Sequence, residues 1–426
     1  MMRTSQRAAW LLTVAPLCLL LAGCSPEKGA ASASGSSGSP AVPTRRDSAG
    51  VAILEYPAGV AQRVPQWMVD TNPLAVIGDD PDGADDVTHV HRPVLLSDGA
   101  VAFWDDARGQ VAVYEPDGSL RRRICRRGQG PDDFGGLYRI SRVADTLIVP
   151  DVINDRTTLL APTLEKLRAE PGPRHCLPVQ ILGRFRDGKL LGDVSPFAQN
   201  DLDGTDTTIR LPRPLLLISQ SQCDTIGLVP GHAMRVVETR FGGYRRTHEA
   251  IVRFGRRTVT ALWDSVIAVG TAQTYRIDIL TEDGKLIRSM RMPRASRPMP
   301  SGLRDSIINS ELQDLKGLHS ERMVDPAESE RLVREATFVA DSLPPYNDLL
   351  VATNHRLWVV DAWAPGIPER SALAFSPSGT IEAHLTMPAR YTPMAFGSDR
   401  VLTRVEDPET GVVTFRVLRM QEAHRE

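Results

Sequence analysis

A unit of four short β-prone runs recurs along the chain, and it limits the possible folds more than any other feature. Asp-Gly or Ser-Gly pairs join several of the runs, where glycine accepts the positive φ of a tight hairpin and aspartate tolerates it. Four-stranded units with a period of about 40 residues are typical of β-propeller blades. A single blade cannot bury both of its faces, so we expect the units to stack in a ring. The pairs are Asp98-Gly99, Asp117-Gly118, Asp187-Gly188, Asp283-Gly284 and Ser378-Gly379.

Five stretches of the chain align with this unit. One of them fits more loosely than the others, because a long polar loop precedes its third strand. The five stretches are residues 89–127, 137–170, 178–231 (the looser one), 258–292 and 347–387.

A sixth unit lacks one strand. Residues 391–420 supply only three strands, so the fourth must come from elsewhere in the chain. We expect residues 74–77 to form the outer strand of this last blade, with residues 51–55 or 67–69 beside it. Such pairing of the two chain ends would remove free sheet edges. The sequence therefore predicts an all-β, six-bladed β-propeller over residues 47–421.

The segment between the fourth and fifth aligned units departs from the strand pattern. Its apolar residues recur at helical spacing, and Asp325, Pro326 and Glu328 form a typical helix start. We expect a helical insertion over residues 301–343 that packs over one rim of the ring. It would be either a surface decoration or a lid or partner-docking element. The apolar residues are Leu303, Ile307, Ile308, Leu312, Leu315, Leu318, Leu332, Val333, Ala336, Val339 and Leu343.

A secretory signal of the lipoprotein type stands at the N-terminus. Arg3 and Arg7 precede an apolar run over residues 8–21, which is shorter than the roughly 20 residues that span a membrane. The run ends in Leu-Ala-Gly-Cys, so that small residues precede Cys24, whose thiol would take a diacylglyceryl group. We expect residues 1–23 to be a signal peptide and Cys24 to be the lipid-anchored first residue of the mature chain. Fatty acyl chains such as palmitate would hold it stably in the membrane.

The next segment, residues 24–46, is rich in Ser, Gly, Ala and Pro, and such a tract cannot bury enough apolar surface to fold. We expect a flexible tether. Ser25 follows the lipid-bearing cysteine in place of an acidic residue, which by resemblance to well-studied lipoproteins favours the outer membrane over the inner one. The formal net charge of −2 and the 5% of aromatic residues argue against nucleic-acid binding.

Three cysteines remain in the predicted mature body. They are Cys125, Cys176 and Cys223, and in an exported protein disulfides can persist. Cys176 and Cys223 would flank the same blade and form the favoured pair. The alternative is three small buried thiols that act as hydrophobic residues.

Two motifs resemble those of NHL repeats. Residues 127–134 read Arg-Gly-Gln-Gly-Pro-Asp-Asp-Phe, which is similar to the family's inter-blade turn Gly-x-Gly-Pro-Gly-x-Phe, with Asp at the later Gly. Asp151, Asn154 and Arg156 match a turn written Asp-x-x-Asn-x-Arg between second and third strands.

Further features extend this resemblance. Asp105 and Asp361 hold the aspartate equivalent to that of the second motif, and the opening Arg-Asp-Ser-Ala-Gly-Val-Ala-Ile-Leu also looks like the start of such propellers. Over nearly all of residues 47–420 the chain resembles bacterial secreted six-bladed propellers with NHL-like repeats. The resemblance implies the fold, but propellers include binding proteins, lyases and lactonases, so the activity stays open.

Metal ligands are one kind of candidate site. His89 and His91 alternate on the presumed innermost strand of the first unit, so both rings could line the central channel and bind zinc. Propeller lyases and lactonases place metals there. No spacing names a third ligand, and ordinary polar strand residues are the alternative. Aspartates within residues 79–86 and 201–206 could hold calcium or form solvated turns.

Arginines before the fourth unit are another kind of candidate site. Arg245, Arg246, Arg256 and Arg257 stand among aromatic residues, and at the channel mouth they could hold a carboxylate or phosphate. The alternative is a structural loop. No nucleophile elbow, P-loop or Cys-His pair is recognisable, so the catalytic residues are unknown.

The sequence therefore favours a membrane-tethered propeller that acts as a binding module for an envelope protein or a small ligand. The alternative is a metal-dependent hydrolase or lyase with its site in the propeller channel. A purely structural envelope component is a third possibility.

Overall fold

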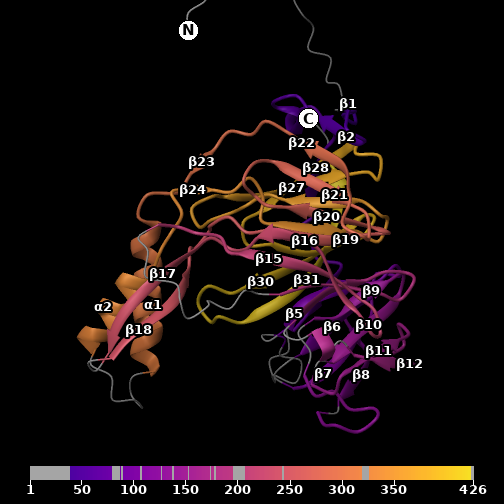
Figure 1. Cartoon of the computed structure of the whole chain (residues 1–426), viewed down its shortest axis with the longest axis horizontal. Helices are drawn as coiled ribbons and strands as arrows, with labels where there is room; N and C mark the ends of the chain where they lie inside the picture. The colour runs from indigo at the N-terminus through magenta and orange to yellow at the C-terminus, as the bar shows by residue number, and fades with distance from the viewer. Residues whose placement is uncertain are drawn as a thin grey trace, which may run out of the picture. The chain divides into compact units, whose positions relative to one another are not determined.

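Six blades of four antiparallel strands make up most of the structure (Figure 1). Three of these blades are separate four-stranded sheets, one is part of a six-stranded sheet, and two are joined by a further strand in a nine-stranded sheet. The computed structural model describes residues 39–78, 87, 90–105, 108–125, 127–136, 139–151, 153–172, 174–176, 179–194, 207–241, 244–318 and 326–423. This part of the chain is mostly β-structure with few helices. No helix within it is long and apolar enough to cross a membrane.

The first three sheets follow one another along the chain, each with its strands paired in sequence order. Blade one holds β5 (Val90–Leu95), β6 (Val101–Asp105), β7 (Gln110–Tyr114) and β8 (Leu120–Cys125). Blade two holds β9 (Ser141–Val143), β10 (Thr146–Asp151), β11 (Arg156–Leu160) and β12 (Lys166–Pro171). Blade three holds β13 (Gln180–Arg184), β14 (Leu190–Asp193), β15 (Pro212–Ile218) and β16 (Cys223–Pro230).

The last three blades repeat this order of strands, and the sixth blade takes one strand from the N-terminal part of the chain. Blade four holds β19 (Val259–Trp263), β20 (Val266–Gly270), β21 (Arg276–Leu280) and β22 (Leu286–Arg291); blade five holds β25 (Asp348–Val351), β26 (Leu357–Val360), β27 (Glu369–Phe375) and β28 (Ile381–Pro388); blade six holds β29 (Thr392–Phe396), β30 (Arg400–Glu406), β31 (Val413–Glu422) and β4 (Ala75–Ile77).

The first strands of the blades lie innermost, and all six of them line one cavity. The strands β9, β13, β19, β25 and β29 contact one another in that order, and β29 contacts β5. Apolar side chains of facing blades form shared cores, for example Phe103 of blade one with Phe415 of blade six, whose ring centroids are 6.1 Å apart. The arrangement is that of a β-propeller.

The outer hairpin turns explain why Asp-Gly pairs recur. At Gly118, between β7 and β8, φ is +92° and a Cβ atom would lie only 2.7 Å from the carbonyl oxygen of Val76 on β4. A residue with a side chain would therefore be strained and would clash with the neighbouring blade. Gly284 contacts Ile226 of the preceding blade in the same way. These glycines set both the turn and the close approach of blades.

Blade six is closed by β4, as the sequence predicts. Ala75, Val76 and Ile77 pair antiparallel with residues 415–417 of β31. Ile77 is only 1% exposed and packs in the core shared by blades six and one. The two ends of the described chain thus meet in one sheet.

Of the two alternatives for a further strand beside this blade, residues 67–69 are confirmed and residues 51–55 are wrong. The strand β2 (Val51–Glu55) pairs parallel with β22 of blade four, where β1 (Thr44–Ser48) extends the sheet. Leu54 is buried in the core between blades four and five, which fixes β2 there. By contrast, β3 (Gln66–Val69) pairs with both β28 and the end of β31. Regular structure also starts before the predicted end of the tether at residue 46, because Ala41 already bridges to Ile381.

The motifs that resemble NHL repeats contact each other. The Asp151 carboxylate is fully buried and accepts hydrogen bonds from the backbone N–H groups of Gly135 and Gly136, at 2.8 and 3.2 Å. It also accepts from the backbone N–H of Asn154 at 3.1 Å, and the Asn154 side chain donates to Gly128 O at 2.9 Å. This network fastens the connection between blades one and two onto the β10–β11 turn.

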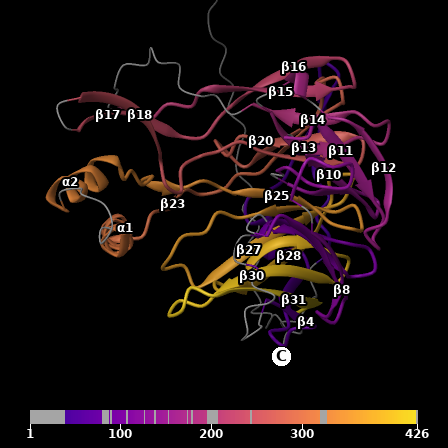
Figure 2. The ribbon, with the colours of Figure 1, turned by 90° about the horizontal axis from the view of Figure 1, so that it is seen from below.

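Two helices, α1 (Leu303–Leu318) and α2 (Pro326–Ala336), lie between blades four and five in the chain. They lie beside a hairpin of β17 (Met234–Phe241) and β18 (Tyr244–Ile251), apart from the blade sheets (Figures 1 and 2). Arg253, just after the hairpin, accepts from Ala340 N and donates from its own N to Phe338 O, and its side chain pairs with Glu311 of α1. The ends of the insertion meet as β23 (Arg297–Pro298) and β24 (Ser342–Leu343).

Closure by β4 can be tested by a single substitution. Ile77→Ala should lower the free energy of unfolding by about 2–5 kcal/mol, because it leaves a cavity in a core shared by two blades. The matched control is Leu228→Ala on β16, where the side chain is 68% exposed and the change should stay within about 0.5 kcal/mol. Urea unfolding followed by circular dichroism measures both. Equal effects of the two substitutions would contradict the closure.

Candidate functional site

A cavity of about 610 Å³ lies beside blade four. Its walls are the end of β2, the β20–β21 connection, the chain after β22 and the chain that leads into β25. Pro293, Pro344 and Pro345 fall in these segments, and proline cannot continue a strand ladder. The backbone therefore leaves the sheet here and encloses a space. We call this cavity the arginine pocket, after its lining residues Arg256, Arg276, Arg291, Arg294 and Arg297.

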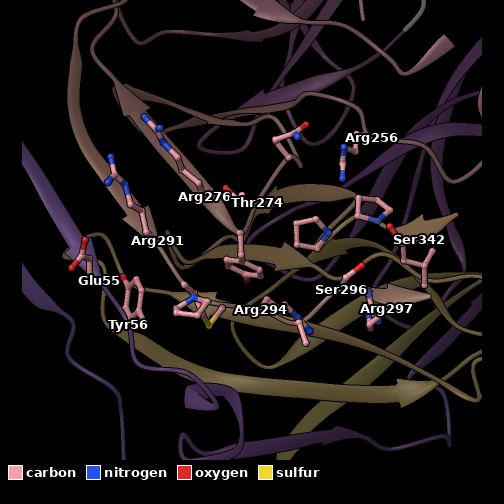
Figure 3. A pocket seen from close by; sticks show the side chains of 18 residues that line it. Glu55, Tyr56, Arg256, Thr274, Arg276, Arg291, Arg294, Ser296, Arg297 and Ser342 are labelled. Carbon is pink, nitrogen blue, oxygen red and sulfur yellow. The ribbon is translucent and has the colours of Figure 1, made fainter. Parts of the chain in front are cut away.

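The five arginines surround the cavity from both sides. Glu55 is the one acid among its described lining residues, and Ser296 and Ser342 add hydroxyl groups. Figure 3 shows Arg276 and Arg291 on the side of Glu55 and Tyr56, with Arg256, Arg297 and Ser342 on the opposite side.

Two of the arginines already have carboxylate partners. Arg294 donates through both terminal nitrogens to Asp361, with Nη1 2.6 Å from Oδ1, and Asp361 is only 2% exposed. The Arg276 Nε atom lies 2.8 Å from Asp278 Oδ1. Glu55 in turn pairs with Arg46 at 3.2 Å. These charges are balanced within the protein.

The other three arginines have no carboxylate partner in the described part of the chain. Arg297 Nη2 donates to the carbonyl oxygen of Ala362 at 2.6 Å, and Arg291 Nε donates to Ser289 Oγ at 3.1 Å. The Arg256 side chain makes no hydrogen bond to a described residue. Burial lowers the pKa of Arg297, the neighbouring Asp361 partly offsets this effect, and Arg294 adds to it. A partly desolvated guanidinium whose hydrogen bonds go to neutral acceptors is stabilised by an arriving anion.

A buried hydroxyl group lies at the base of this pocket. Tyr275 is 4% exposed, and its Oη atom has no hydrogen-bond partner among the described residues. The Arg294 guanidinium lies over its ring, 5.3 Å from the centroid. Burial raises the pKa of Tyr275 well above its usual value, so the phenol stays neutral and keeps its proton as a donor. Buried hydroxyl groups without a partner are uncommon in proteins.

The structure distributes the predicted anion-binding arginines among different places. Arg256 lines the arginine pocket, whereas Arg257 donates to the carbonyl oxygen of Asn347, with Nη2 at 2.7 Å. Arg245 and Arg246 belong to β18 in the hairpin, and their side chains are outside the described part. Sequence reasoning missed Arg276, Arg291, Arg294 and Arg297. The last three of these could have been noticed in the sequence, because arginines recur there at every third residue and continue past the end of blade four.

The predicted metal ligands cannot be placed. His89 and the aspartates of residues 79–86 and 201–206 lie outside the described residues, as does the His91 side chain. In the described part, no group of three His, Cys, Asp or Glu side chains is arranged to hold a metal. The lipidation site Cys24 also lies outside it.

The structure joins Cys176 to Cys223 by a disulfide, with Cα atoms 5.8 Å apart. Cys176 lies in the short helix η2 (Arg174–Cys176) and Cys223 begins β16. The bond therefore connects the entry of blade three to its outer strand.

The ring of four-stranded blades makes this protein a β-propeller. The arginine pocket is its candidate anion-binding site. No protein-family model matches the chain, and no curated protein matches its sequence. A protein from Bacteroides fragilis NCTC 9343 described as exported is similar in structure, with 11% identity, a TM-score of 0.42 and coverage of 87% of this chain and 100% of that one.

Two further solved structures are similar over most of the chain. A member of the DUF4221 family from Bacteroides vulgatus has 10% identity and a TM-score of 0.46, with coverage of 84% of this chain and 99% of that one. Virginiamycin B lyase from Staphylococcus aureus has 7% identity and a TM-score of 0.38, with coverage of 83% and 99%. Because these values are low, the propeller assignment rests on the strand pairing of this chain itself.

Burial and three nearby arginines give His232 a pH-dependent effect on stability. Burial, followed by Arg213, Arg257 and Arg210, lowers the pKa of His232 to about 4. Unfolded histidine titrates near 6.5, so between pH 6.5 and 4 the unfolded chain binds more protons and stability falls as the pH falls. His232→Gln should make the free energy of unfolding less dependent on pH in this range. The reduction should be less than about 1.4 kcal/mol per pH unit, because the ring is partly exposed. Urea unfolding across this range measures it, and an unchanged slope would contradict the assignment.

Proposed function

We propose that this chain is a lipid-anchored β-propeller of the bacterial cell envelope that binds an anionic ligand in the arginine pocket. It acts as a binding module, and the lipid on Cys24 holds it in the membrane, with the outer membrane favoured. The observation that carries the proposal is the presence of three arginines, Arg256, Arg291 and Arg297, around one cavity without a paired carboxylate among the described residues.

The chemistry of the pocket suits carboxylates and phosphates. Guanidinium groups offer paired N–H donors that match the oxygens of either group. The apolar lining residues Met292, Leu343 and Pro344 would contact the carbon part of an organic ligand. A free small anion and an acidic group on an envelope protein share this chemistry. Either of these partners is consistent with the pocket, whereas we do not propose a nucleic acid as its ligand.

The pocket is tested by titration of the full-length protein in detergent with citrate and, separately, with pyrophosphate. Arg256→Ala and Arg297→Ala should each weaken binding at least about tenfold, because a lost charged hydrogen bond costs roughly 1.5–3 kcal/mol. Isothermal titration calorimetry gives the affinities. Tighter binding of citrate would indicate a carboxylate ligand, and tighter binding of pyrophosphate would indicate a phosphate ligand.

The matched control is Arg404→Ala. This arginine lies on blade six and pairs with Glu406 at 2.8 Å, away from the pocket. Its replacement should leave the affinity for either probe unchanged. If neither probe binds, or if the control weakens binding as much as the pocket variants, the proposed anion site is wrong.

The anchor is tested separately. Cys24→Ala should prevent incorporation of a palmitate analogue and should move the protein from the membrane fraction to the soluble fraction of cells. Replacement of Cys125, by contrast, should leave labelling intact. Labelling that persists in Cys24→Ala cells would refute lipidation at this position.

A further inference from the structure

We propose that the axial cavity of the propeller is a second, independent binding site, and that it takes a small organic carboxylate. This cavity has a volume of about 600 Å³ and is lined by residues of all six innermost strands or their immediate ends. It shares no lining residue with the arginine pocket. The proposal therefore goes beyond the function proposed above and does not depend on it.

One end of the axial cavity carries an excess of positive charge. Arg92 of blade one lies 3.7 Å from Asp348 of blade five, measured from Nη1 to Oδ2. Arg139, before β9 of blade two, lines the same cavity but makes no hydrogen bond or ion pair to a described residue. The two guanidinium groups thus have one carboxylate between them.

The electrostatics of Arg139 agree with this geometry. Burial and then repulsion from Arg92 lower its pKa to about 10, and attraction to Asp348 and Asp193 only partly offsets them. Asp193 is already committed, because its Oδ2 atom lies 2.6 Å from Arg213 Nη2. Among the described residues, Arg92, Arg139 and Arg213 face two aspartates, Asp193 and Asp348, so one positive charge of this group has no acidic counterpart there. A desolvated cation of this kind is stabilised by one carboxylate from outside.

The backbone directs Arg92 toward this site. Arg92 has a φ of +45° and lies in an irregularity of β5, where the pairing register shifts between His91 and Val94. A positive φ is unfavourable for a residue with a side chain, and such strain is often found at functional sites. The bulge interrupts the strand alternation at the position where the guanidinium enters the cavity.

At the other end of the cavity, the acidic side chains already have hydrogen-bond partners. Asp264 Oδ1 lies 2.6 Å from His355 Nδ1, and Asp145 accepts from the backbone N–H of Ser97 at 2.9 Å and from its hydroxyl. Arg142 at that end already has two nearby carboxylates, Asp145 and Asp264, so the carboxylate of a ligand would lie at the end with Arg92 and Arg139. Its carbon skeleton would contact the apolar lining residues Val94, Leu350 and Met394. The expected ligand is a monocarboxylate with a short carbon chain.

The test is a titration of the full-length protein in detergent with aliphatic monocarboxylates from acetate to hexanoate, followed by saturation-transfer NMR and calorimetry. The wild-type protein should bind at least one of them with a dissociation constant of about 1 mM or lower. Arg139→Gln should weaken that binding at least tenfold, and Arg139→Lys should recover part of it because the charge is restored. Unchanged melting curves of both variants show that they fold.

The two sites are separated by crossed controls. Arg256→Ala should leave unchanged the part of the monocarboxylate binding that Arg139→Gln removes, and Arg139→Gln should leave the citrate or pyrophosphate titration unchanged. If no monocarboxylate binds the wild-type protein, or if Arg139→Gln binds it as well as the wild type does, the axial site is overturned even when the arginine pocket is confirmed. If Arg256→Ala abolishes monocarboxylate binding, the two cavities are not independent and the proposal is also overturned.

Discussion

The pairing of β4 with β31 joins residues from the two ends of the described chain in one sheet. Without it, blade six would have three strands, residues 415–417 of β31 would form an open edge, and the core shared with blade one would lose Ile77. The shared core around Ile77, Phe103 and Phe415 makes this closure apolar as well as hydrogen-bonded. The ring, and hence the cavity on its axis, depends on this contact between chain segments that are far apart in sequence.

Both cavities are consequences of how blades are joined. The axial cavity exists because six innermost strands face one axis, each contributing residues to the lining. The arginine pocket exists because blade four carries extra strands and is followed by the helical insertion. The end of β2 brings Glu55 and Tyr56 to one wall, and the β23–β24 pair at the base of the insertion brings Arg297 and Ser342 to the other. The insertion thus has a structural part in the pocket whatever its helices contact.

Local patterns predicted much of this fold. Turn glycines and strand length indicated the blades, and the incomplete sixth unit pointed to residues 74–77 as its missing strand. The parallel pairing of β2 with blade four was missed, because it depends on the burial of Leu54 against distant residues. The sequence singled out Arg256, but not its convergence with Arg291 and Arg297, because ring geometry rather than spacing brings them together. The same holds for Arg92, Arg139 and Asp348, which come from three different blades.

The most direct test of the central claim is a crystal structure of the protein soaked with selenate, whose selenium gives an anomalous signal. We predict an anomalous peak in the arginine pocket, with selenate oxygens in contact with Arg256 and Arg297. A pocket that is open and well ordered but holds no selenate, while the anion occupies exposed surface arginines, would contradict the proposed site.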